Sequence, residues 1–232
     1  MLNLEEIATQ LESTNSRDRM LALVSLRDVS AEKALPLIKK VLYDEILPVR
    51  SMAISALGIK ATTESYPLLV KLLQTDEDYG IRADAAGALG YLEDNRAYEA
   101  LVRAFYEDNS WLVRFSAVVS LGNLKDDRAK EIFLEALESS EPILQQAAIA
   151  GIGEIKAIDA IDKILNFANV EDWLTRQRLA EALGNLESEK SISALNFLTK
   201  DSHPQVRDAA DIALKKHRQK ISRNPSPSKK EC

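Results

Sequence analysis

The sequence predicts an all-α fold, a right-handed α-solenoid (superhelix) of about seven short helical pairs. Seven residues spaced 31 or 32 apart each stand near the start of an amphipathic segment. Small residues follow each of them at fixed distances, and glycines recur at one of these distances. The seven anchor positions are Arg19, Arg50, Arg82, Arg114, Gln145, Arg176 and Arg207. A fixed period of this length indicates stacked units with a nearest-neighbour core. We therefore predict one elongated repeat domain over residues 1–217.

The segment 34–61 illustrates the predicted pair of helices. Leu35, Ile38 and Leu42 fall at helical spacing and indicate a first helix of about three turns. Pro48 suits the first turn of a second helix, because its missing N–H would have no partner there. The apolar face predicted for that second helix consists of Val49, Ala53, Ala56 and Leu57.

An acidic residue and a glycine keep fixed distances from the anchor. Asp44, Asp76, Asp108 and Asp201 stand six residues before it, and Gly58, Gly90, Gly122, Gly153 and Gly184 stand eight residues after it. We predict that the Asp side chains cap backbone N–H groups at the start of the second helix. We predict that each Arg side chain bridges to the Asp of its own unit or to the Asp of the next unit. Anion capture by the row of arginines is the alternative. A helical glycine costs about 1 kcal/mol against alanine, so five in register indicate close backbone approach or helix ends.

The two ends of the array differ from its interior. Arg27 and Lys215 occupy the position of the inner glycines, which predicts polar capping repeats. Gln145, preceded by Ser139, marks the fifth repeat as the weakest match. Residues 218–232 have prolines, serines and no apolar period, which predicts a disordered basic tail. The tail is either solvated or in contact with RNA or a membrane surface.

Composition excludes several classes of protein. The net charge is −6 although the tail is basic, so the repeats are acidic and nucleic acid is not an expected partner. Cys232 is the single cysteine, which excludes an internal disulfide and a cysteine-based zinc site. Glu5 and Glu6 stand where a signal peptide needs basic and apolar residues, and no apolar run is long enough to insert into a membrane. We expect a cytoplasmic protein.

Two segments carry a family resemblance: DEDYGIRADAAGALGYL, over Asp76–Leu92, and DNSWLVRFSAVVSLGNL, over Asp108–Leu124. They resemble the short HEAT-like repeats of the phycobilisome-lyase family, and the resemblance extends over residues 1–217. It implies a scaffold that acts on phycobiliproteins in phycobilisome degradation or in detaching and handling the bilin chromophore. The alternatives are a bilin lyase subunit that attaches phycocyanobilin to a phycobiliprotein cysteine, and a general protein–protein adaptor with no pigment role.

The same resemblance bears on cofactors and partners. It implies no permanently bound cofactor, a transient linear tetrapyrrole such as phycocyanobilin, and a hetero-oligomer if the chain is a lyase subunit. Whether the chain is an enzyme stays open, because it contains no catalytic motif to carry over. His203 and His217 have no second ligand at metal spacing, so we expect no metal site.

Aromatic rings recur three residues before the anchor, at Tyr79, Trp111 and Trp173. One interpretation is that each ring packs over the first turn of its helix and stabilises the helix entry. The other is a line of rings along one edge of the superhelix, suited to stacking on a tetrapyrrole or to holding a partner helix.

The second helices predict a binding groove on the concave surface of repeats one to four. Met20, Met52, Phe115 and Val119 fall one, two or five residues after an anchor and make this surface more apolar than solvent requires. A helix face shifted by one residue is the alternative. Asp84 lies in the same stretch, where it either accepts a hydrogen bond from a pyrrole N–H or pairs with a neighbouring Arg.

Overall fold

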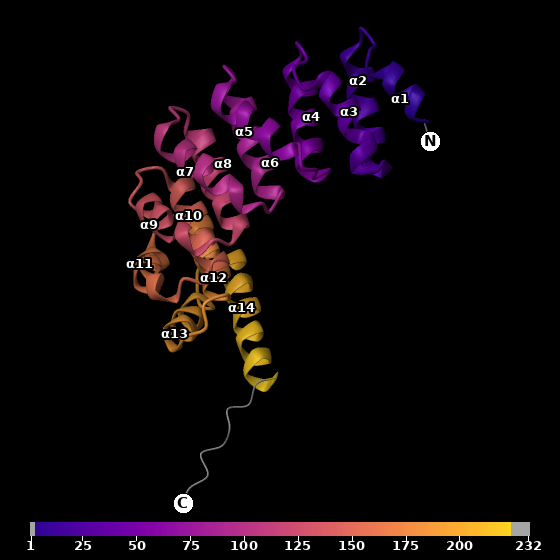
Figure 1. The fold of residues 1–232 in the computed structure, drawn as a ribbon. Helices are drawn as coiled ribbons and strands as arrows, with labels where there is room; N and C mark the ends of the chain where they lie inside the picture. Colours follow the sequence, from indigo (N-terminus) through magenta and orange to yellow (C-terminus); the bar gives the residue numbers. More distant parts are fainter. Residues whose placement is uncertain (1–2, 224–232) are drawn as a thin grey trace, which may run out of the picture. The chain divides into compact units, whose positions relative to one another are not determined.

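A computed structural model describes residues 3–223, with side chains described to Gln219. Within this range the regular elements are fourteen α-helices and five short 3-10 helices, with no strand (Figure 1). The predicted all-α class is therefore confirmed, and the fourteen helices form the seven predicted pairs. The hand of the superhelix stays a prediction.

The chain divides into two compact units, residues 1–124 and residues 125–232. The single repeat domain over 1–217 stays a prediction. The division between the units comes directly before the fifth repeat, where Gln145 stands in place of the anchor arginine and Ser139 in place of the aspartate. The spacing of 31 or 32 residues continues through this point, whereas the anchor arginine and its aspartate are both replaced there.

The first unit contains four helical pairs. Its elements are α1 (Leu4–Gln10), α2 (Ser16–Ser25), η1 (Leu26–Asp28), α3 (Ala31–Val41), α4 (Leu47–Ile59), α5 (Ser65–Thr75), α6 (Tyr79–Tyr91), η2 (Asn95–Ala97), α7 (Tyr98–Glu107) and α8 (Trp111–Leu124). Each odd-numbered helix packs on the even-numbered helix that follows it. The even-numbered helices pack in series, α2 on α4, α4 on α6 and α6 on α8, so they form one layer.

The second unit contains three pairs. Its elements are η3 (Asp127–Ala129), α9 (Lys130–Leu137), α10 (Pro142–Glu154), η4 (Ile158–Ala160), α11 (Ile161–Leu165), η5 (Asn166–Asn169), α12 (Trp173–Leu183), α13 (Glu189–Leu198) and α14 (Pro204–Arg223). Here α10, α12 and α14 pack in series.

The last helix is longer than the sequence predicts. Residues 218–223 belong to α14, so the expected start of a disordered tail at 218 is wrong. Extending an existing helix adds one hydrogen bond for each residue fixed, and arginine, glutamine and lysine favour this. The remainder of the predicted tail, 224–232, lies outside the described residues.

Close packing of the second helices explains the recurring glycines. A Cβ added to Gly58 of α4 would lie 3.1 Å from Ala88 of α6, and one added to Gly153 of α10 would lie 2.8 Å from Ala182 of α12. Gly90 and Gly184 meet the next second helix in the same way. The predicted close backbone approach is thus confirmed at these positions. Val49, Ala53 and Leu57 are fully buried, as predicted. Arg27 and Lys215 are exposed, as expected of capping repeats.

Candidate functional site

Four anchor arginines, Arg19, Arg50, Arg82 and Arg176, each join their own helical pair to the next pair of the same unit. The Arg82 Nη1 donates to the backbone carbonyls of Asp76 at 2.9 Å and Glu77 at 3.1 Å, in the turn before its own helix. Its Nε and Nη2 donate to the Asp108 carboxylate of the next pair at 2.7 and 3.0 Å. One guanidinium therefore closes the turn of its own pair and bridges to the following pair.

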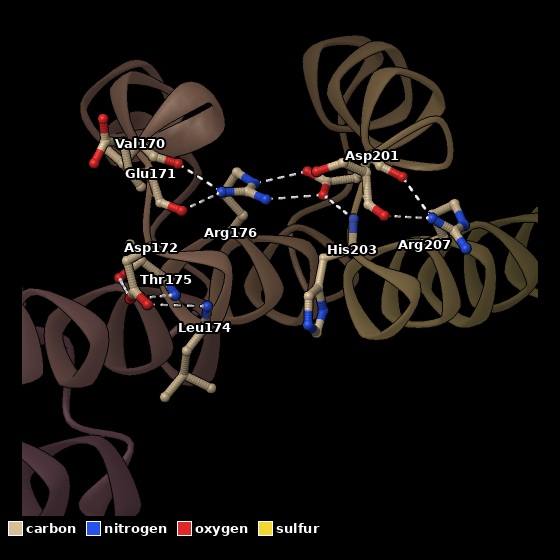
Figure 2. Close-up of polar contacts among 10 residues, drawn as sticks. Val170, Glu171, Asp172, Leu174, Thr175, Arg176, Asp201, His203 and Arg207 are labelled. Carbon is tan, nitrogen blue, oxygen red and sulfur yellow. Dashed lines mark hydrogen bonds and ion pairs between the residues drawn. The ribbon is translucent and has the colours of Figure 1, made fainter.

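Arg176 repeats this arrangement in the second unit. Its Nη1 donates to the carbonyls of Val170 at 2.6 Å and Glu171 at 2.9 Å, and its Nε and Nη2 donate to Asp201 at 2.7 and 2.9 Å (Figure 2). The predicted bridge to the next unit is confirmed. Arg19 pairs with Asp44, and Arg50 with Asp76, in the same direction.

We call these arginine–aspartate pairs the ladder, and Asp44, Asp76, Asp108 and Asp201 the ladder aspartates. Each ladder aspartate also holds the turn that precedes the second helix. The carboxylates of Asp44, Asp108 and Asp201 accept from the backbone N–H two residues later, at 2.8–2.9 Å. Hydrogen bonds from Arg176 and the His203 backbone lower the pKa of Asp201 against the opposing effect of burial. At Asp108 burial raises the pKa, but hydrogen bonds from Arg82 and the Ser110 backbone outweigh it, so the pKa is lowered.

These pairings overturn the alternative of anion capture for Arg19, Arg50, Arg82 and Arg176, which are all bound to carboxylates. A hollow of about 390 Å³ between α5 and α7 is lined by Arg82 and Asp108 together with Arg103 and Glu107. Arg103 pairs with Glu107 at 2.7 Å, so the positive groups of this hollow are neutralised. The ladder is structural.

The fifth repeat keeps the hydrogen bonds that close the turn, but its two side chains, Gln145 and Ser139, are uncharged. The Gln145 Nε2 donates to the carbonyl of Ser139 at 2.8 Å, in the place of an anchor arginine. The Ser139 Oγ accepts from the Glu141 N–H at 3.1 Å, in the place of a ladder aspartate. Val170 stands where Gln145 would need a carboxylate in the next repeat.

The three predicted rings each begin a helix, and their surroundings differ. Tyr79 and Trp111 are 57% and 49% exposed at the starts of α6 and α8. Trp173, at the start of α12, stacks on His203 with ring centroids 4.1 Å apart, and His203 precedes α14. The Trp173 ring thus packs on the next repeat, while the other two face solvent. Leu47 begins α4 at the same phase and is exposed, but the recurrence of aromatic rings does not predict it because Leu47 is aliphatic.

A stripe of exposed and half-buried residues runs across the layer of second helices in the first unit. We call it the second-helix face; it consists of Leu21, Val24, Met52, Ser55, Ile59, Asp84, Gly87, Tyr91, Ser116, Val119 and Asn123. On α4, α6 and α8 these residues are spaced i, i+3 and i+7, and on α2 they are spaced i and i+3, so they share one side of each helix. Ile59, Tyr91, Val24 and Val119 are 74%, 71%, 56% and 39% exposed. Four neighbouring helices thus present apolar side chains to solvent.

This face includes most of the predicted groove. Met52, Asp84 and Val119 lie on it, and Met20 and Phe115 are half-buried at its margin, one position earlier on α2 and α8. The equivalent position on α6 is Ala83, which is buried, so the face is centred one residue later than Met20 and Phe115 suggest. Trp173 belongs to the other unit. Ile59 and Tyr91, nine residues after an anchor, were missed; continuing the i, i+3, i+7 series would have found them.

Asp84 is half-buried on this face. It makes no hydrogen bond or ion pair with any side chain that the structure describes, up to Gln219, so the expected pairing with a neighbouring Arg does not occur among residues 3–219. Contact with a pyrrole N–H stays a prediction.

The equivalent side of the second unit is polar. Its residues are Ala147, Ala150, Glu154, Arg178, Glu181, Asn185, Ala209, Ile212 and Lys216. Arg178 pairs with Glu181 at 2.7 Å, and Lys216 donates to Asn185. Ile212 is its one large exposed apolar residue.

Other chemistry is sparse in the part of the chain that the structure describes. Over residues 3–223, no three His, Cys, Asp or Glu side chains are grouped so as to hold a metal ion. Within the same range, every helix is too short or too polar to cross a bilayer.

Three overlapping stretches of the sequence match HEAT repeats: residues 4–90, 67–142 and 131–215. The chain belongs to the HEAT-repeat family. This membership accounts for the paired helices and their period, and no curated protein sequence matches this HEAT-repeat chain.

Solved structures with a similar fold include two natural complexes and a designed protein. A chain in the complex of CpcE and CpcF of phycocyanin lyase from Nostoc sp. PCC7120 is 21% identical, with a TM-score of 0.60 and coverage of 94% of this chain and 95% of that one. A structure of Kap95p with RanGDP gives 15% identity and a TM-score of 0.61, over 94% of this chain and 36% of that one. An engineered protein gives 20% identity and a TM-score of 0.57, over 94% and 68%. These likenesses concern the fold alone.

Proposed function

We propose that this HEAT-repeat protein is a scaffold that binds a phycobiliprotein through the second-helix face of residues 1–124. The observation that carries the proposal is the exposed apolar stripe on four neighbouring helices, which the equivalent helices of the second unit lack. Contiguous exposed apolar surface on a soluble domain is typical of a protein interface. Methionine on the face suits an irregular partner, because its side chain is flexible.

Two observations support this class of partner. The segments Asp76–Leu92 and Asp108–Leu124 resemble repeats of the phycobilisome-lyase family. One chain of the CpcE–CpcF complex of phycocyanin lyase shares the fold over nearly its whole length and nearly the whole length of this chain. Within this class, we propose a role in phycobilisome degradation, as in a protein of the NblB type, or in detaching and handling the bilin.

Binding to purified phycocyanin tests the proposal. Val24, Val119 and Ile212 all stand five residues after an anchor, and all three are exposed. We expect Val24→Lys and Val119→Lys each to weaken binding at least tenfold, because a charge on the apolar face must be desolvated. Ile212→Lys, at the same helical position in the second unit, is the matched control and should leave the affinity unchanged.

Calorimetry or biolayer interferometry measures these affinities, and circular dichroism confirms that the variants fold. Absence of binding by the wild-type chain, or equal losses in all three variants, would overturn the proposal. Binding to other proteins but not to phycocyanin would instead identify a general adaptor.

The second candidate function is that of a bilin lyase subunit, and the CpcE–CpcF likeness is the observation that favours it. Such a role needs transient contact with phycocyanobilin, for which Asp84 offers an unpaired carboxylate. Mixing the chain with free phycocyanobilin should then shift the visible absorbance, and Asp84→Asn should reduce the shift. An unchanged spectrum at high micromolar protein would exclude this candidate.

A further inference from the structure

Gly87 is the glycine that the fold of the first unit does not explain. It lies inside α6 on the second-helix face, and a Cβ added to it would meet no atom within 4 Å. Gly58 and Gly90, by contrast, lie against the next second helix. A glycine inside a helix is unfavourable against alanine. At Gly87 no packing within residues 3–223 offsets that cost.

Asp84 is the second unexplained residue, and it lies one helical turn before Gly87. Its carboxylate is half-buried, and it pairs with nothing among the described residues. The corresponding positions of the neighbouring helices are Met52 on α4 and Ser116 on α8, so no cation of the face is positioned to pair with it. An unpaired carboxylate within an apolar surface favours a cationic partner that arrives with a ligand.

From these two residues we infer that the second-helix face receives an amphipathic helix of the partner protein. The helix lies closest to the scaffold over Gly87, where the missing side chain leaves room, and one of its Lys or Arg side chains pairs with Asp84. This inference rests on the proposed function and specifies its binding mode, a helix laid across an apolar surface by its own apolar side.

The extent of the face favours a helix over a tetrapyrrole as the occupant. The face crosses four packed helices, and neighbouring helix axes lie about 8–10 Å apart. It therefore extends over roughly 24–30 Å, the length of an α-helix of about 16–20 residues. A single small pigment would cover only part of this stripe.

Substitution of Gly87 tests the close approach. The added side chain of Gly87→Ala or Gly87→Leu meets open space in the free protein, so we expect Tm to stay the same or to rise by about 2–4 °C. Phycocyanin affinity should fall in the order glycine, alanine, leucine, with at least a tenfold loss for leucine. Ala150→Leu, at the same helical position in the second unit, is the matched control and should not change the affinity. A loss of affinity without loss of stability separates a binding role from a structural one.

A charge exchange tests Asp84. The probes are synthetic 20-residue helical peptides with a leucine stripe and a central Lys or Glu, labelled for fluorescence anisotropy. Wild-type protein should bind the Lys peptide at least tenfold more tightly than the Glu peptide, and Asp84→Lys should reverse this preference. A peptide with serine replacing each leucine should not bind.

The outcomes distinguish the inference from the proposed function. Unchanged binding in Gly87→Leu and Asp84→Lys, with loss in Val119→Lys, would overturn the inference and leave the proposed function in place. Binding of the Lys peptide with the expected effects, but not of phycocyanin, would overturn the proposed function and support the inference. Failure of both probes to bind wild-type protein would overturn both.

Discussion

Residues 3–124 and 125–223 are built from the same type of repeat, but they differ in their arginine–aspartate bridges and in the exposed side of their second helices. The first unit holds three arginine–aspartate bridges in succession, from Arg19–Asp44 to Arg82–Asp108, and presents an apolar second-helix face. The second unit holds one such bridge, Arg176–Asp201, and presents a polar face. Turn geometry survives in both, since Gln145 and Ser139 keep the backbone contacts of an anchor and a ladder aspartate.

The comparison separates what the fold needs from what has diverged. A hydrogen bond from the anchor side chain to the preceding turn occurs in both units, from arginine at Arg82 and Arg176 and from glutamine at Gln145. A charged bridge between pairs and an apolar exposed face are additions that the second unit partly lacks. The proposed binding surface therefore lies on the first unit and not on the array as a whole.

The tryptophans allow the two units to be followed independently. The chain has two, Trp111 in the first unit and Trp173 in the second. Trp173→Phe leaves a reporter for residues 1–124, and Trp111→Phe leaves one for residues 125–232.

The largest effect should come from breaking a bridge in the first unit. Arg82→Met keeps the aliphatic stem but leaves the half-buried Asp108 carboxylate without its bridging cation, which should cost about 3 kcal/mol of unfolding free energy. Urea unfolding followed by Trp111 fluorescence measures it. Arg207→Met is the control: Arg207 donates to the carbonyls of Asp201 and Ser202, so its loss should cost about 1 kcal/mol by Trp173 fluorescence. Equal losses would show that the charged bridge adds nothing to turn closure.

Close helix packing should give the next largest effect, and it should be common to both units. A Cβ at Gly90 would lie 2.6 Å from the Ser120 Oγ, which donates to the buried Ala86 carbonyl at 2.8 Å. We expect Gly90→Ala to cost about 1–3 kcal/mol. Gly153→Ala, against Ala182, should cost a similar amount in the second unit. Urea denaturation of the single-tryptophan variants compares them, and an unchanged midpoint in either would contradict this account of the glycine register.

Completing the ladder in the second unit should have a smaller effect. Gln145→Arg with Val170→Asp supplies the cation and the carboxylate that the equivalent positions carry elsewhere. We expect the double variant to exceed the sum of the single variants by about 1 kcal/mol. A double-mutant cycle of unfolding free energies measures this coupling. A coupling of zero would mean that α10 and α12 do not hold these positions at bridging distance.

The smallest effect concerns acid sensitivity. The pKa values of Asp108 and Asp201 are lowered in the folded protein, so the unfolded chain binds more protons near pH 4. Their contribution is present above the unfolded value of about 3.9 and is lost as the pH falls through the lower folded value. Asp108→Asn should therefore flatten the acid dependence reported by Trp111, and Asp201→Asn that reported by Trp173. Unfolding midpoints measured between pH 2 and 7 check this, and parallel curves for variant and wild type would contradict it.

Periodicity predicted the fold because the constraints on it are local and repeated. Val49, Ala53 and Leu57 show a buried face by spacing alone, and the glycine register indicates close approach because a helical glycine is otherwise unfavourable. The sequence left open whether Arg82 binds its own Asp76 or the next Asp108, since both lie within reach of a long side chain. The structure shows that it contacts the Asp76 carbonyl and the Asp108 carboxylate.

The candidate site was predicted less completely. Met52, Asp84 and Val119 were found from their distance to the anchor, but Ile59 and Tyr91 stand nine residues after an anchor, beyond the five residues over which the helix face was predicted. The different settings of Trp111 and Trp173 depend on the next repeat, which supplies His203 to only one of them. The division at residue 124 could not be read from a period that continues through it.

Turn closure by the anchor has a consequence for how such an array grows. Arg176 holds the carbonyls of Val170 and Glu171 within one helical pair, and Arg82 and Arg207 make the equivalent bonds, so each of these pairs carries its own clasp. A duplicated segment of 31 or 32 residues would bring along both this clasp and an aspartate to receive the preceding arginine. Whole pairs can thus be gained or lost by gene duplication or deletion without redesigning the joints on either side.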